Sequence, residues 1–172
     1  RVVLRCLALV IFQFVIAHPR NVAAETETGL QDAVRPLTEG VPEVAVVRLR
    51  QFLQGKIADA DRKNAITKLG EALVAAGQPA EALTVLDAAE IRDTPEAKFF
   101  RAQALAALAR WNEALPLYLQ AALDPRATFH AEAIFGQEEA YRALGQIDAA
   151  LAVLRGLQHD PRWLSRARLR MC

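Results

Sequence analysis

An alanine followed by a leucine recurs through this chain at a nearly constant interval. Three Ala-Leu pairs, Ala82-Leu83, Ala114-Leu115 and Ala150-Leu151, hold the same place in three segments that align, and they stand 32 and 36 residues apart. A period of about 34 residues is typical of an array in which one supersecondary unit is stacked repeatedly. The recurrence therefore restricts the possible folds strongly, because each unit must cover the apolar face of the unit before it.

Each period contains the pattern of two amphipathic helices joined by a turn. In the first period, Gly77 suits the left-handed position after a helix, and Pro79 suits the first turn of the next helix. Asp124-Pro125 and Asp160-Pro161 close the later periods, because the residue before a proline is driven out of the helical region. Apolar residues recur at spacings of three and four on both sides of the first turn, at Ile66, Leu69, Leu73 and Ala76 and then at Ala82, Leu83, Leu86 and Ala89.

The composition agrees with a chain of packed helices. Hydrophobic residues make up 53% of the sequence, which is enough for a core, whereas aromatic residues make up only 6%. Abundant alanine favours helices and lets them approach closely. The two cysteines, Cys6 and Cys172, stand near the two ends, which excludes a disulfide framework and a metal site built on cysteine spacing.

Charge and motifs point away from nucleic-acid binding and catalysis. Residues 25–172 hold 18 basic and 20 acidic residues, so this part is close to neutral and gives no argument for a nucleic-acid partner. The histidines, His18, His130 and His159, have no second ligand at metal-binding spacing. No nucleophile elbow, P-loop or dinucleotide-binding glycine pattern occurs. We therefore predict no catalytic activity, no cofactor and no metal.

Residues 1–24 have the pattern of a secretory signal peptide. Arg1 and Arg5 precede an apolar run over residues 7–17, and Val22 and Ala24 are small enough for cleavage before Glu25. The run is shorter than the roughly 20 apolar residues of a membrane span. Export to the periplasm or cell envelope is the expectation, with an uncleaved N-terminal membrane anchor as the alternative.

The repeating unit resembles the tetratricopeptide repeat (TPR), a helix–turn–helix of about 34 residues. Glu138 and Leu157 depart from it, since small residues are expected at those places. Two expectations follow for the third unit, either looser helix packing or a boundary shifted by one or two residues. The matching residues are Gly70 and Ala102 at the eighth place, Leu73, Leu105 and Tyr141 at the eleventh, Ala82, Ala114 and Ala150 at the twentieth, Leu86, Tyr118 and Leu154 at the twenty-fourth, and Ala89 and Ala121 at the twenty-seventh.

The resemblance implies an all-α fold, a right-handed α-solenoid of TPR hairpins. Three repeats are expected over residues 63–162, preceded by a linker and a degenerate helical repeat over residues 25–62, whose helical part covers about 30–54. Trp163, Ala167 and Met171 form an apolar stripe. We therefore expect residues 163–172 to begin a further, truncated repeat helix whose arginines are solvated.

In the TPR family, the first helix of each unit lines a concave protein-binding surface. Transferring those positions predicts a mixed surface with two phenylalanines rimmed by acids, suited to a partner segment with basic and apolar residues. The alternative is that Phe99 and Phe135 are packing residues between units. The predicted groove residues are Asn64, Thr67, Glu71, Glu96, Phe99, Gln103, Glu132, Phe135, Glu139 and Arg142.

The function expected from the resemblance is that of a non-catalytic scaffold for protein–protein interaction, which binds a protein or peptide partner and is exported. Two alternatives stay open at this point. The array is the N-terminal spacer or assembly domain of a longer envelope protein, or it precedes the catalytic domain of a multidomain enzyme.

Overall fold

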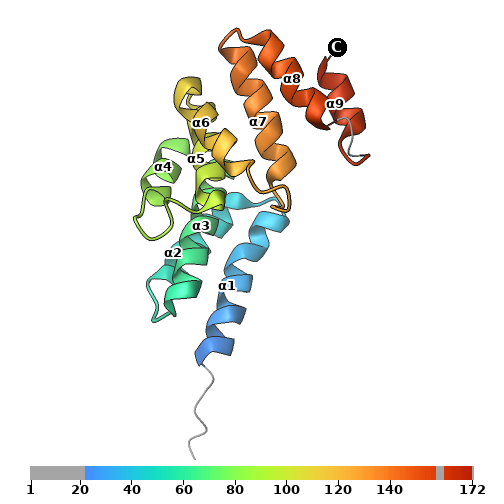
Figure 1. Cartoon of the computed structure of the whole chain (residues 1–172). Coiled ribbons are helices and arrows are strands. Elements are labelled where there is room, and N and C mark those ends of the chain that lie inside the picture. Colours follow the sequence, from blue (N-terminus) through green and yellow to red (C-terminus); the bar gives the residue numbers. More distant parts are fainter. Residues whose placement is uncertain (1–21, 158–160, 172) are drawn as a thin grey trace, which may run out of the picture.

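The computed structural model describes residues 22–157 and 161–171, with side chains from residue 29 onward. Every regular element in these ranges is an α-helix, and Figure 1 shows the helices following one another as hairpins. The helices are α1 (Val22–Thr38), α2 (Pro42–Leu53), α3 (Asp59–Ala75), α4 (Pro79–Leu86), α5 (Pro95–Ala107), α6 (Trp111–Ala121), α7 (His130–Ala143), α8 (Ile147–Leu157) and α9 (Leu164–Met171).

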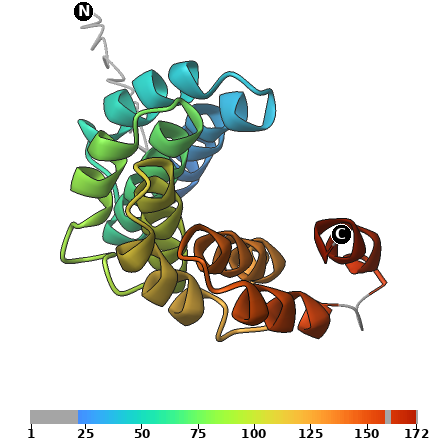
Figure 2. The same ribbon diagram turned by 90° about the horizontal axis from the view of Figure 1, so that it is seen from above.

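The helices form an open solenoid rather than a closed bundle. Each helix packs on the next one in the chain, and α1, α3, α5 and α7 also pack on one another in sequence. Within the described ranges, no helix backbone closely approaches that of a helix more than two places along the chain. Seen from above, the row of helices bends into an open arc (Figure 2). Such nearest-neighbour stacking is the architecture of repeat proteins, and the predicted all-α solenoid is confirmed.

The arc has an inner and an outer layer. The backbones of the odd-numbered helices α1 to α7 approach one another closely, whereas those of α2, α4, α6 and α8 do not in the described part of the chain, where the ion pair of Arg50 with Glu81 links α2 to α4. The inner helices can approach because small side chains face inward between them. Ala72 in α3 and Ala97 in α5 are completely buried and belong to the same core cluster. The curvature therefore follows from close packing on one side of the array and wider separation on the other.

One turn geometry joins the two helices of every unit. Gly77 adopts φ +71°, the N–H of Gln78 donates to the carbonyl of Leu73 over 2.8 Å, and the N–H of Gly77 donates to that of Val74 over 3.1 Å. These two bonds form a Schellman motif, which satisfies carbonyls left open at the helix end. Pro79 then opens α4, as the sequence predicts. The same left-handed position recurs at Gly40, Ala109 and Gly145.

The contact between the two helices of the first repeat depends on a glycine. A Cβ atom at Gly70 in α3 would overlap the side chain of Leu86 in α4, which is fully buried. Gly136 in α7 plays a similar part between units, because a Cβ there would overlap the ring of Tyr118 in α6. The eighth and twenty-fourth places of the first unit therefore face each other across the hairpin.

Two helix boundaries differ from those expected, and a third lies close to its expected place. α1 begins at Val22, so the predicted cleavage site before Glu25 falls in its first turn, and the rest of the predicted signal peptide, residues 1–21, lies outside the described residues. α3 begins at Asp59, ahead of residue 63, because Asp59 and Asp61 supply acids to its first turn. Helix α2 ends at Leu53, close to the expected end of the degenerate unit.

The stripe predicted for the second helix of the first repeat is wrong at its last position. α4 ends at Leu86, and Ala89 lies exposed in the turns that follow. Ile91, in the same turns, is buried and joins the core cluster instead. A larger aliphatic side chain removes more apolar surface from water than an alanine does. The connection from α4 to α5 therefore runs so that Ile91, and not Ala89, is buried.

The expectation that the arginines of the last segment are solvated is wrong for Arg170, which is half-buried, whereas Arg166 is exposed. α9 buries Ala167 and packs Trp163 and Met171 against the third core cluster, as the stripe predicts. However, Arg166 lies over the ring of Phe135, with 4.2 Å from its Cζ atom to the ring centroid. Arg170 pairs with Glu138 on α7, so this segment is joined to the third repeat by charge as well as by apolar contact.

Candidate binding groove

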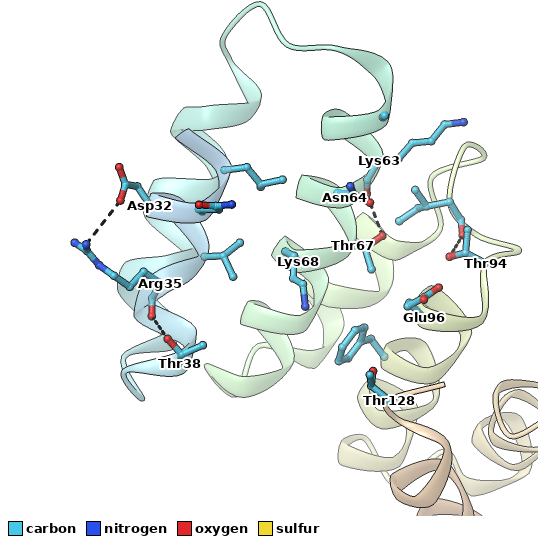
Figure 3. Close-up of a pocket in the computed structure, with 16 residues that line it drawn as sticks. Asp32, Arg35, Thr38, Lys63, Asn64, Thr67, Lys68, Thr94, Glu96 and Thr128 are labelled. Carbon is cyan, nitrogen blue, oxygen red and sulfur yellow. Dashed lines mark hydrogen bonds and ion pairs between the residues drawn. The ribbon is translucent and has the colours of Figure 1, made fainter. Parts of the chain in front are cut away.

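The concave side of the arc carries two hollows that run into each other. Lys68, Glu96, Phe100 and Thr128 line both of them, so they form one continuous groove across α1, α3, α5 and α7. The first hollow, of about 1030 Å³, lies between α1, α3 and α5 and is drawn in Figure 3. The second, of about 860 Å³, lies between α3, α5 and α7. A groove of this size can accept several side chains of a partner segment.

The first hollow, which we call the threonine hollow, has a hydroxyl-rich lining. The Thr67 hydroxyl donates to the carbonyl of Lys63 over 3.0 Å, and the Thr94 hydroxyl donates to that of Ile91 over 2.8 Å (Figure 3). Each hydroxyl oxygen keeps acceptor capacity for a partner. The lining residues that carry this hollow's polar character are Asp32, Arg35, Thr38, Lys63, Asn64, Thr67, Thr94 and Thr128.

The second hollow, which we call the acidic hollow, gathers four carboxylates from three helices. They belong to Glu71 of α3, Glu96 of α5, and Glu132 and Glu139 of α7. Lys68 is the one cation among the described residues that line it, and its ammonium lies 2.7 Å from Glu71. Neither Glu96, Glu132 nor Glu139 forms an ion pair within the described part of the chain. The acidic hollow is therefore a region of net negative charge.

Aromatic rings form the floor and wall of the acidic hollow. Phe99 is buried, with 4% of its surface exposed, and its ring stacks on that of Phe129 with 5.1 Å between centroids. Phe100, whose centroid lies 5.2 Å from that of Phe99, is half-buried and faces both hollows. Trp111 and Tyr118 complete the wall. The groove thus combines an apolar base with a charged rim.

The hydroxyl of Tyr118, in this wall, has a shifted pKa. Burial raises the pKa of its hydroxyl well above the usual value, because the phenolate would lose its hydration, and the carboxylate of Glu139 raises the pKa further. Its ring is also held in place on both sides, by Phe99 at 6.3 Å between centroids and by the backbone of Gly136. Tyr118 is therefore a neutral, rigid part of the groove.

The structure brings together eight of the ten residues predicted for the groove. Phe135 and Arg142 line neither hollow. Arg142 instead pairs with Glu138 over 3.2 Å, beside α8 and α9. The eight residues that line the groove are Asn64 and Thr67 in the threonine hollow, Glu96 in both hollows, and Glu71, Phe99, Gln103, Glu132 and Glu139 in the acidic hollow.

Phe99 and Phe135, which were predicted as groove anchors, are buried packing residues, as the alternative prediction stated. Phe135 is only 3% exposed, with the ring of Trp163 at 6.0 Å and the guanidinium of Arg166 above it. Phe100 is an aromatic residue that a partner can reach, and the sequence analysis did not single it out. Its position four residues after Glu96 puts both on one face of α5, and this spacing was the available signal.

The sequence matches the profile of a known protein family. The profile of the family described as Tetratrico peptide repeat matches residues 21–134 and, in a second overlapping match, residues 95–169. The chain belongs to the TPR family. These matches extend into all nine described helices, α1 and α9 included, so the degenerate first unit and the last helix are part of the same array.

Two solved structures have the same architecture as this TPR chain. One is the crystal structure of the nearly identical TPR-like repeats of a kinesin light chain protein from Podosopora anserina, with a TM-score of 0.66, 22% identity, and coverage of 84% of this chain and 86% of that one. The other is a singly substituted form of the same repeats, with a TM-score of 0.66, 21% identity and coverage of 87% of both chains. At this identity the likeness shows the fold alone. No curated protein sequence matches significantly.

The family establishes the general class of function. TPR arrays are scaffolds for protein–protein interaction, and neither the family match nor the structural neighbours indicate an enzyme family. Within the described residues, no group of three or more His, Cys, Asp or Glu side chains is placed to hold a metal ion.

Proposed function

We propose that this TPR protein is a non-catalytic scaffold, exported to the bacterial periplasm or envelope, that binds a segment of a partner protein in its concave groove. The observation that carries the proposal is the continuity of the two hollows through Lys68, Glu96, Phe100 and Thr128. An extended segment lying along them would contact four successive inner helices. Its apolar side chains would meet half-buried Phe100, and its polar groups would meet the threonines and the carboxylates.

The groove suits such a segment because it offers anchors and a polar rim together. A few buried aromatic contacts supply most of the free energy of binding in protein interfaces, while the rim excludes water and sets specificity. Phe100 and Trp111 are half-buried, so each has ring surface left to cover.

A photo-crosslinking experiment tests this binding mode. The photoreactive residue p-benzoylphenylalanine is placed at Gln103, inside the acidic hollow, or at Gln120, exposed on the outer helix α6. In the cells that make the protein, Gln103 is expected to crosslink to a distinct partner and Gln120 is not. Phe100→Ala should reduce the Gln103 product. Equal products from both positions, or none from Gln103, would contradict the proposal.

Export rests on the sequence of residues 1–24 and needs its own test. Among the described residues, no helix is both long and apolar enough to cross a bilayer. If the N-terminal segment is a cleaved signal, the full chain expressed in a bacterium is recovered from the periplasm with Glu25 as its first residue. A protein that retains Arg1 and sediments with membranes would favour the anchor. Retention in the cytoplasm would refute export.

A further inference from the structure

The C-terminal helix shows which chemistry an acidic and aromatic face of this array accepts. The guanidinium of Arg166 lies over the ring of Phe135 at 4.2 Å, and that of Arg170 lies 5.4 Å from the same centroid. Arg170 also pairs with the carboxylate of Glu138 over 2.6 Å. An arginine can stack its planar guanidinium on a ring and donate to a carboxylate at the same time. The chain therefore contains its own example of this recognition.

The acidic hollow has the same two components without the arginine. Phe100 supplies a half-buried ring, and Glu96 stands one helical turn before it on α5. Glu132 and Glu139 face them from α7. On the face that α9 covers, Phe135 and Glu138 are likewise separated by one turn of helix. The difference is that no guanidinium of the described chain enters the acidic hollow.

One buried carboxylate oxygen in the acidic hollow has no hydrogen-bond donor. The Oε2 atom of Glu132 is buried and accepts no hydrogen bond within the described part of the chain. A buried acceptor without a donor is costly, more so when it is charged. Lys68 does not relieve the negative charge, because its ammonium is already paired with Glu71. The hollow therefore favours a ligand that brings positive charge and several N–H donors.

We infer that the acidic hollow binds an arginine side chain of the partner segment, with the guanidinium stacked on Phe100 and paired with Glu96 and Glu132. This inference rests on the proposed function, because the arginine belongs to the segment that occupies the groove. Arginine is favoured over lysine because an ammonium is more strongly hydrated and cannot form two parallel bonds to a carboxylate. The partner segment would thus carry an arginine beside residues that suit the threonine hollow.

Peptide titrations followed by NMR test the inference on the full chain. The probes are nine-residue alanine–leucine peptides that differ only at the central residue, which is arginine, lysine or citrulline. Citrulline keeps the shape of arginine but removes its charge. The arginine peptide is expected to shift amide signals of α5 and α7 around Glu96, Gln103 and Glu132. Its Kd should be at least about tenfold lower than that of the citrulline peptide, as for loss of one charge-assisted hydrogen bond.

Variants of the chain test which side chains are responsible. Glu132→Gln and Glu96→Gln keep side-chain size and should each weaken the arginine peptide about tenfold, with little effect on the citrulline peptide. Glu43→Gln, on the outer helix α2, removes the same charge outside the groove and should leave the Kd unchanged. Phe100→Leu should weaken arginine more than lysine, because only the guanidinium stacks.

The outcomes separate this inference from the proposed function. Equal Kd values for arginine and citrulline peptides, or equal effects of Glu132→Gln and Glu43→Gln, would overturn the arginine site. A crosslink from Gln103 to a partner would still support groove binding in that case. If Gln103 forms no crosslink and the arginine peptide binds no more tightly than the citrulline peptide, both groove binding and the arginine site are refuted. Self-association of the chain that Glu132→Gln abolishes would identify a second copy as the occupant and would also overturn the inference.

Discussion

The carboxylate of Glu138 on α7 lies 2.6 Å from the guanidinium of Arg170 on α9. Glu138 is 1% exposed and stands where the repeat pattern expects a small residue. Arg142, one turn along α7, holds its other oxygen over 3.2 Å. The acid is therefore satisfied from two helices, and the departure from the pattern is explained by a partner that lies 32 residues further along the chain.

Removing Arg170 should destabilise the C-terminal part of the array. Arg170→Met keeps the aliphatic contact but leaves Glu138 buried with one donor fewer, which is expected to cost about 1–3 kcal/mol. Adding Glu138→Gln should restore part of that loss, because the buried charge is gone. Urea unfolding of the single and double variants measures the coupling. Additive effects of the two changes would show that the pair is not energetically linked.

Ala109 is the one non-glycine residue with positive φ among the described residues, at +57°. The other three hairpin turns have glycine at this position, which avoids the steric conflict of a Cβ atom. Ala109→Gly should raise the free energy of unfolding by about 0.5–1 kcal/mol, since relief of strain exceeds the added entropy of the unfolded chain. Gly145→Ala is the matched opposite and should lower it. A destabilising Ala109→Gly would refute this account of the turn.

Gly70 should not tolerate even one added methyl group. Gly70→Ala drives a Cβ into Leu86 and is expected to cost about 1–3 kcal/mol, despite the better helix propensity of alanine. Gly156→Ala in α8 is the matched control, because a Cβ there meets nothing within 4 Å, and it should be neutral or slightly stabilising. Thermal unfolding followed by circular dichroism compares the two. Similar Tm changes would argue against the tight contact between α3 and α4.

The hydroxyl of Tyr118 should resist ionisation while the protein is folded. Burial raises its pKa, so the neutral form is favoured in the folded state, and the associated stability is present below pH about 10 and lost as the pH rises further. The chain has two tyrosines, so Tyr141→Phe leaves Tyr118 as the only phenol. Its absorbance at about 295 nm should titrate at higher pH in buffer than in denaturant. The same midpoint in both would place the hydroxyl in water.

The sequence was sufficient for the fold because the evidence for it is local and repeated. Gly77 and Pro79 define a turn by backbone chemistry alone, and the alternation of small and large apolar residues defines which faces meet. Eight residues that line the groove were also predicted by the resemblance to the TPR family, since a residue's place in the unit decides whether it faces the concave side. Neither inference required knowledge of distant contacts.

Only the tertiary structure showed which aromatic side chains are buried, because their burial depends on contacts between units. Adjacent Phe99 and Phe100 have the same chemistry, yet Phe99 is covered by Phe129 and Tyr118 while Phe100 faces the groove. Phe135 fills the equivalent place to Phe99 but is covered by arginines of α9. Burial of a side chain depends on what the neighbouring unit places over it, and a repeat pattern that describes one unit at a time does not contain that information.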